Sequence, residues 1–210
     1  MKWIYVRGRR NGEVMTKKIE FYFDFASPNC YLAYKALPDF VDMASVEVKP
    51  CLLGGVFKAT GNQAPMVAFS GVKGKLAYEM LEFQRFIARH KLDRFKMNPN
   101  FPVNTLLVMR GLVALDDNQA AYIEAVLTAL WEEEKNLNDP DIVREVWAAA
   151  GFDADALLEK TQDPAVKAAL AEKTGEAVAR GIFGLPAFFV DGDMFFGKER
   201  LGQVAEAASA

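Results

Sequence analysis

The stretch that decides the fold runs from Ile19 to Pro28 and reads IEFYFDFASP. Its first eight residues are short, aromatic and nearly all apolar, which is typical of a buried central strand. Serine is a preferred N-cap and proline is favoured at the first helical position, so Ser27 and Pro28 predict that a helix begins directly after this strand. Residues 46–52 (VEVKPCL) alternate as a second strand does. Strand, helix and strand in this order are the unit of a parallel sheet.

Beyond this unit the chain is helical for most of its length and then returns to strands. The predicted helices, each with an apolar stripe, span residues 74–88, 104–115, 119–131, 140–150, 153–159 and 163–180. The segment GIFGLP at 181–186 ends this pattern. Residues 187–190 and 194–196, joined by Asp191-Gly192, predict a β-hairpin, and a last helix spans about 198–207. The order β-α-β, helices, β-β-α predicts an α/β fold with a long helical insertion.

Composition and charge exclude several classes of protein. The 210 residues are 51% hydrophobic with a net charge of −3, which suits a globular protein and makes nucleic acid an unlikely partner. Two cysteines make no disulfide scaffold, and a single histidine, His90, cannot build a Cys/His metal cluster, so we expect no metal. No apolar run reaches the length of a membrane span, so we expect no membrane partner.

The N-terminal residues are basic, with Arg7, Arg9 and Arg10 before the first strand. No apolar run of signal-peptide length follows them. We therefore expect residues 1–18 to form an N-terminal extension, of which 1–14 have no role in the fold, and the protein to be cytoplasmic.

Ser27 is the first candidate for chemistry. A hydroxyl at the start of a helix lies among free backbone N–H groups and at the positive end of the helix dipole, where negative charge is favoured. The position is therefore suited to hold a thiolate, including one that belongs to a ligand. The alternative is that Ser27 only caps the helix.

Pro186 is the second candidate. Proline directly before a core strand is unusual, and cis X–Pro bonds concentrate at turns of this kind. A cis bond would point the backbone of Leu185 outward, where it could pair with an extended peptide ligand. The alternative is an ordinary turn proline.

Four segments together resemble the 2-hydroxychromene-2-carboxylate isomerase family, near relatives of the kappa-class glutathione transferases. They read FDFASPNCYLAY from residue 23, GGVFKATGNQAP from 54, NFPVNTL from 100 and GIFGLPAFFVDGDMFFGKERL from 181. The resemblance extends from Ile19 to about Gln203. It implies a thioredoxin-like domain of the DsbA type at 19–56 and 181–210, with an inserted all-helical domain at 57–180.

The resemblance also implies glutathione as the cofactor. Ser27 stands where the family replaces the first redox cysteine, so its hydroxyl would stabilise the bound thiolate as the catalytic residue. Glu199 replaces an aspartate of the family pattern and reaches one methylene further. The residues implied to bind glutathione are Ser27, Pro28, Asn29, Asn62, Leu185, Pro186, Gly197, Lys198, Glu199 and Arg200.

Two residues are candidates for holding the substrate. Asn104 falls where the isomerases place a substrate contact, and its alternative role is to cap the next helix. Lys58 carries an ammonium that could pair with a substrate carboxylate. The family's lysine lies one position earlier, at Phe57, so a surface lysine is the alternative for Lys58.

Cys30 is the main departure from the family, because it stands at the place of the second redox cysteine. Three roles are open for Cys30. It could be a buried inert residue, a thiol that resolves mixed disulfides with glutathione, or the centre of a monothiol redox enzyme. We expect Cys51 to pack in the core and His90 to lie on a solvated helix face.

The sequence thus predicts a glutathione-dependent isomerase of 2-hydroxychromene-2-carboxylate or a related aromatic catabolite, acting by reversible thiolate addition, and a homodimer like many relatives. The alternatives are a kappa-like glutathione transferase, a DsbA-like thiol oxidoreductase that uses Cys30, and a binding protein without catalysis.

Overall fold

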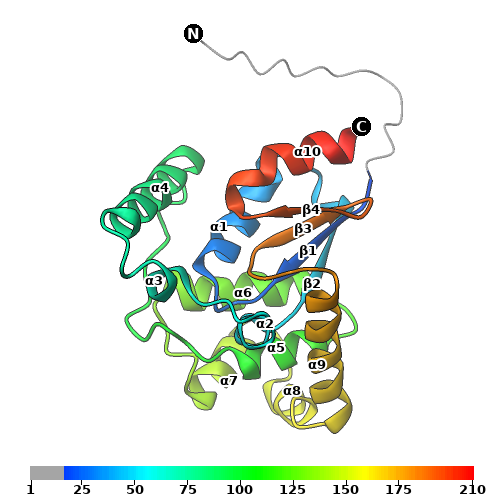
Figure 1. Cartoon of the computed structure of the whole chain (residues 1–210). Coiled ribbons are helices and arrows are strands. Elements are labelled where there is room, and N and C mark those ends of the chain that lie inside the picture. The colour runs from blue at the N-terminus through cyan, green and yellow to red at the C-terminus, as the bar shows by residue number, and fades with distance from the viewer. Residues whose placement is uncertain (1–16) are drawn as a thin grey trace.

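The protein is built on a four-stranded sheet with the order β2-β1-β3-β4 (Figure 1). The computed structural model describes residues 17–210. β1 (Ile19–Phe23) pairs in parallel with β2 (Val46–Pro50) and antiparallel with β3 (Ala187–Val190). β3 pairs antiparallel with β4 (Asp193–Phe196). The predicted α/β architecture and the predicted hairpin are confirmed.

Helices fill the chain between β2 and β3. α1 (Pro28–Ala36) follows β1 and α10 (Leu201–Ser209) follows β4, after a 3₁₀ turn at Lys198–Arg200. The helices between β2 and β3 are α2 (Leu53–Thr60), α3 (Pro65–Ala68), α4 (Lys75–His90), α5 (Leu106–Val113), α6 (Gln119–Trp131), α7 (Pro140–Ala149), α8 (Ala154–Lys160) and α9 (Pro164–Ala179). The sequence analysis did not predict α2 and α3.

The predicted N-terminal extension lies mostly outside the described residues, which begin at Lys17. The last two residues of the extension, Lys17 and Lys18, contact α10 and β2. The Lys17 N–H donates to the Ala208 carbonyl at 3.0 Å, and the Lys18 ammonium pairs with Glu47 at 2.6 Å.

The two faces of the sheet differ in what they bury. Ile19, Phe21 and Phe23 alternate along β1 and are fully buried on one face. Glu20 and Tyr22 point to the other face, where α9 packs against β2. In Figure 1, α10 lies above the sheet, α7 and α8 lie below it, and α4 stands at one side. The period of two along β1 therefore separates an apolar face from a face that carries charge.

The core continues from the sheet into the inserted helices. Phe25, just beyond β1, lies 6.1 Å from Tyr122 of α6 between ring centroids, and Tyr122 lies 6.0 Å from Trp147 of α7. The Trp131 indole N–H donates to the Phe25 carbonyl at 3.0 Å. A side chain at Gly111 of α5 would overlap the Tyr122 hydroxyl, so α5 and α6 approach closely there. The helices and the sheet thus share one core.

Candidate functional site

Ser27 forms the junction between β1 and α1, as its position in the sequence predicts. It is the N-cap of α1, with extended backbone angles (φ −92°, ψ 113°), and its Oγ accepts the Cys30 N–H at 3.2 Å. Pro28 follows at the first position of the helix. The Ser27 residue is only 3% exposed. Its hydroxyl is therefore largely shielded from water at the positive end of a helix.

The segment before β3 meets this hydroxyl from the far end of the chain. The Leu185–Pro186 peptide bond is cis. The Ser27 hydroxyl donates to the Leu185 carbonyl at 3.3 Å, across 158 residues of sequence. The Leu185 N–H donates no hydrogen bond to any residue that the structure describes. The backbone of Leu185 thus adjoins Ser27 and keeps a free donor.

Two further predicted residues are tied to the same segment. Asn62 follows α2 after Gly61, which adopts the left-handed conformation (φ 71°), and its side-chain amide donates to the Phe183 carbonyl at 2.7 Å. The Gly197 N–H donates to the Pro186 carbonyl at 2.9 Å. The structure therefore groups Asn62, Leu185, Pro186 and Gly197.

The residues that follow Gly197 point in different directions. Lys198 is 6% exposed; its ammonium pairs with Glu199 and lies 5.5 and 5.4 Å from the ring centroids of Phe83 and Phe86 on α4. The Glu199 side chain is half exposed. Arg200 is exposed and forms no ion pair with a described residue. Lys198 thus contributes to the docking of α4, whereas Glu199 remains open to solvent.

Asn29 lies in the first turn of α1, beside Ser27. Its Oδ1 atom is buried and has no hydrogen-bond partner among the described residues. A buried acceptor without a partner costs free energy, about 1–3 kcal/mol. Asn29 therefore retains a polar atom that a ligand could satisfy.

The structure does not place the two substrate candidates in contact with Ser27. Lys58 is exposed on α2. The Asn104 side-chain oxygen accepts the Leu106 N–H at 3.0 Å, and the Asn104 backbone N–H donates to the Asn138 side-chain oxygen at 2.9 Å. Asn104 thus satisfies one N–H at the start of α5, although the N-cap residue of that helix is Thr105.

Both cysteines are free and buried. Burial raises the pKa of the Cys30 thiol to about 12, despite its place at a helix start. Burial also raises the pKa of Cys51 well above its ordinary value. A thiol that stays protonated at neutral pH is a poor nucleophile, so Cys30 has the properties of the inert interpretation.

Asp24 is a buried acid that the sequence analysis missed. It follows β1, is 1% exposed, and accepts three hydrogen bonds: from the Ala26 N–H at 2.9 Å, the Leu53 N–H at 2.7 Å and the Thr105 hydroxyl at 2.6 Å. Burial raises its pKa, and these donors act in the opposite direction. A signal was present in the sequence: Asp24 is an acid inside the otherwise apolar run YFDFA.

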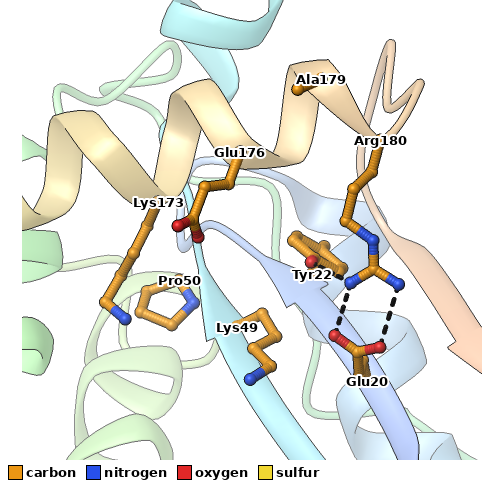
Figure 2. Close-up of a pocket in the computed structure, with 8 residues that line it drawn as sticks. All are labelled: Glu20, Tyr22, Lys49, Pro50, Lys173, Glu176, Ala179 and Arg180. Carbon is orange, nitrogen blue, oxygen red and sulfur yellow. Dashed lines mark hydrogen bonds and ion pairs between the residues drawn. The ribbon is translucent and has the colours of Figure 1, made fainter.

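Arg180 is a second residue that the sequence analysis missed. It follows α9 directly before the Gly181–Pro186 segment and bonds the end of that helix to β1. Its guanidinium donates to both carboxylate oxygens of Glu20, at 2.6 and 3.0 Å, and to the Tyr22 hydroxyl at 2.6 Å (Figure 2). It also lies 3.9 Å from the Phe189 ring centroid. The hydrogen bonds from Arg180 lower the pKa of Glu20.

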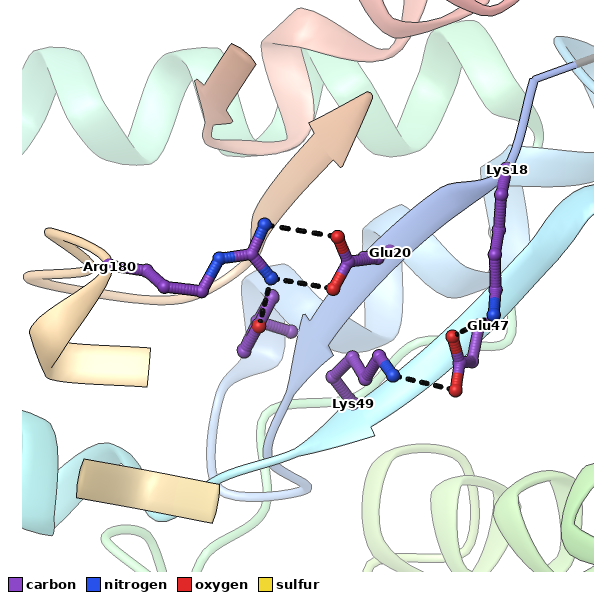
Figure 3. A network of polar contacts seen from close by, with 6 residues as sticks. Lys18, Glu20, Glu47, Lys49 and Arg180 are labelled. Carbon is purple, nitrogen blue, oxygen red and sulfur yellow. Dashed lines mark hydrogen bonds and ion pairs between the residues drawn. The ribbon is translucent and has the colours of Figure 1, made fainter. Parts of the chain in front are cut away.

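A hollow of about 360 Å³ lies beside this contact, away from Ser27. Its lining residues are those drawn in Figure 2: Glu20, Tyr22, Lys49, Pro50, Lys173, Glu176, Ala179 and Arg180. Next to it, Glu47 pairs with both Lys18 and Lys49 at 2.6 Å (Figure 3). Ion pairs thus satisfy much of the charge on this face of the sheet.

The prediction for His90 was wrong. Its side chain is 8% exposed and lies 3.3 Å from the Asp39 carboxylate. Its ring is 4.4 Å from Phe86 and 5.5 Å from Phe40 between centroids. The last turn of α4 docks on the segment after α1, a tertiary contact that the charged neighbours of His90 in the sequence do not reveal.

Residues 17–210 contain no group of three or more metal-ligating side chains. Within the same range no helix is both long and apolar enough to cross a membrane.

Comparison with known proteins agrees with this architecture. Residues 18–209 match the DSBA-like thioredoxin domain. The 2-hydroxychromene-2-carboxylate isomerase of Sphingobium xenophagum is 31% identical over 193 residues, which cover 89% of this chain and 95% of that enzyme. Glutathione S-transferase kappa 1 of Rattus norvegicus is 29% identical, with 89% and 88% covered. A solved structure of a 2-hydroxychromene-2-carboxylate isomerase superposes with a TM-score of 0.76 at 26% identity, covering 90% of this chain and 93% of that one.

These relatives are enzymes, and the predicted thioredoxin-like fold with its long helical insertion is confirmed. The chain belongs to the family of proteins with a DSBA-like thioredoxin domain.

Proposed function

We propose that this protein is a glutathione-dependent isomerase that acts on 2-hydroxychromene-2-carboxylate or a related ring-opened aromatic acid. The observation that carries the proposal is the contact between the Ser27 hydroxyl and the Leu185 carbonyl at 3.3 Å. It joins a helix start suited to an anion with a backbone segment suited to an extended peptide.

The residues at the site fit a tripeptide thiol. Leu185 offers a free N–H and a carbonyl, the pair of groups that a strand-like peptide uses. Asn29 offers a buried acceptor without a partner. The Glu199 carboxylate is half exposed; it pairs with Lys198 and would accept a ligand ammonium beside that ion pair or in place of it. We propose that these residues hold glutathione, together with Asn62 and Arg200.

Binding would redirect one hydrogen bond. The Ser27 hydroxyl now donates to the Leu185 carbonyl. An amide N–H of an extended ligand would take over that carbonyl, which releases the hydroxyl to donate to a sulfur. The Cys30 N–H continues to donate to Ser27 Oγ, which polarises the hydroxyl further.

Bound glutathione would supply a thiolate that adds reversibly to a conjugated carbon of the substrate, so that a double bond becomes a single bond and can rotate. Ser27 would hold the sulfur as an anion and would not itself attack carbon. Low exposure at Ser27 and Leu185 keeps water from competing for the sulfur. Lys58 is the candidate to hold the substrate carboxylate. The Asn104 side chain would first have to give up its hydrogen bond from the Leu106 N–H.

The direct test is binding followed by product analysis. Titration calorimetry should detect glutathione binding, and the trans product should accumulate from 2-hydroxychromene-2-carboxylate without loss of free glutathione thiol. Absence of glutathione binding would refute the proposal.

A kappa-like transferase is the second candidate, because kappa-class relatives match at 29% identity over most of the chain. The same site would then leave the sulfur attached to the electrophile. Loss of one free thiol per product formed would select the transferase. The thiol oxidoreductase is disfavoured, because Cys30 is fully buried and its pKa is about 12.

We further infer that two copies of the chain associate through exposed apolar side chains of α3 and α4. The apolar side chains more than two-fifths exposed on these helices are Met66, Val67, Tyr78, Met80 and Leu81. A concentration of exposed apolar side chains on two neighbouring segments is typical of an interface. Sedimentation should find a dimer that Leu81→Glu weakens, and a monomeric wild-type protein would contradict the inference.

A further inference from the structure

Three helix starts converge on the Asp24 carboxylate. The N-terminal N–H of α2, from Leu53, donates to one carboxylate oxygen at 2.7 Å. The hydroxyl of Thr105, the N-cap of α5, donates to the other oxygen at 2.6 Å. The Ala26 N–H, in the turn that leads into α1 at Pro28, donates to that same oxygen at 2.9 Å. One buried acid therefore joins the beginnings of α1, α2 and α5.

No cation among the described residues accounts for this acid. Its pKa responds to burial and to its three hydrogen-bond donors, and not to a charged neighbour. The titratable groups close enough to be affected by its charge are the thiols of Cys30, from α1, and Cys51, beyond β2. Burial keeps both thiols protonated at neutral pH. Burial raises the pKa of Asp24, and the helix ends and the three donors oppose that rise by favouring the carboxylate.

Ser27, three residues further along the chain, is the N-cap of α1 and so lies at the positive end of that helix. A helix N-terminus carries roughly half a positive charge, so the start of α1 favours a sulfur anion at Ser27. A thiolate that is stabilised too strongly is a weaker nucleophile, because nucleophilicity falls as the thiol becomes more acidic. A negative charge beside the helix end makes the thiol less acidic and so opposes this loss of nucleophilicity.

We propose that Asp24 is a positioning residue that joins the starts of α1, α2 and α5 beside Ser27, and that it is ionised, so that its negative charge offsets the positive end of α1 and keeps a sulfur anion bound at Ser27 nucleophilic. The inference rests on the proposed function, because it concerns glutathione bound at Ser27.

The test compares Asp24→Asn with the wild-type protein by the ultraviolet absorbance of the bound thiolate as the pH is raised. The variant should ionise bound glutathione at a pH lower by about one unit, the size of shift that a nearby like charge causes. The matched control is Glu20→Gln, which removes one negative charge roughly 13 Å further back along β1 and should leave the midpoint unchanged. A role for Asp24 in structure alone would weaken glutathione binding without moving the midpoint, and that outcome would overturn the proposal.

A second measurement needs no variant and covers the case in which Asp24→Asn does not fold. Coupling is reciprocal, so a thiolate at Ser27 must raise the pKa of Asp24. Carbon-13 NMR of the Asp24 carboxyl should titrate at higher pH with glutathione bound than with S-methylglutathione bound, which carries no thiolate. Equal titrations would overturn the inference while the proposed function stands; no binding of glutathione to the wild-type protein would overturn both.

Discussion

Ser27→Ala distinguishes the role of Ser27 as a helix cap from its role as a thiolate partner. Loss of the cap should change the melting temperature, whereas loss of the thiolate partner should change the pKa of bound glutathione and the turnover. As a cap, the Ser27 Oγ accepts one N–H, from Cys30, at 3.2 Å. Loss of a serine N-cap costs about 1 kcal/mol of stability, which lowers the melting temperature of a domain of this size by about 2–4 °C.

As a thiolate partner, the same hydroxyl has a larger expected effect. A hydrogen bond to a charged group contributes about 1.5–3 kcal/mol, and one pKa unit corresponds to about 1.4 kcal/mol. Ser27→Ala should therefore raise the pKa of the bound glutathione thiol by about one to two units. The thiolate fraction near neutral pH, and with it the turnover, should fall roughly 10- to 100-fold.

The assays are the thiolate absorbance of bound glutathione, turnover, and thermal unfolding. The matched control is Asp139→Ala, which removes the N-cap of α7 that accepts the Asp141 N–H at 2.9 Å. The control should lose similar stability and keep full turnover. If Ser27→Ala melts 2–4 °C lower and yet retains its thiolate midpoint and its turnover, Ser27 is only a cap and the reasoning fails.

Three further predictions follow from the packing and the charges. Cys30, fully buried with a pKa of about 12, should resist iodoacetamide at pH 7.5 until the protein unfolds; rapid labelling of the native protein, followed by mass spectrometry, would show that the thiol is reactive. Arg180 lowers the pKa of Glu20 below its ordinary 4.5, so the pair contributes stability, at most about 1 kcal/mol, that is present above pH 4.5 and is lost as the pH falls through the lowered pKa. The urea midpoints of wild type and Glu20→Gln should therefore differ at pH 7 and approach each other as the pH falls below 4.5, and a gap that does not narrow in acid would contradict this. Gly111→Ala should destabilise by about 1–3 kcal/mol through overlap with the neighbouring ring, whereas Gly202→Ala, with nothing within 4 Å, should be neutral or stabilising by up to about 1 kcal/mol; equal urea midpoints would show that the α5–α6 contact relaxes freely.

The parts of the site that could be predicted are those with a local signal. Ser27 could be found because serine followed by proline after an apolar strand marks a helix start. Pro186 could be found because proline directly before a strand is unusual at that place. The GIFGLP segment likewise stood out as a break between helix and strand.

Other features have no local signal. Glu20 and Arg180 are 160 residues apart in the chain, and neither residue type is unusual where it stands. His90 has charged neighbours on both sides and is nevertheless packed between two aromatic rings. Only the packing of α4 and α9 against the rest of the molecule decides these environments.

The sequence by itself determined the order of strands and helices, the helix start at Ser27 and the turn at Pro186, because side-chain period, capping and proline act over a few neighbouring residues. The tertiary structure alone decided that the Ser27 hydroxyl meets the Leu185 carbonyl, that Cys30 is sealed from solvent, and that Asp24 joins three helix starts. Those properties depend on distance and burial, which exist only after segments far apart in the chain have packed together.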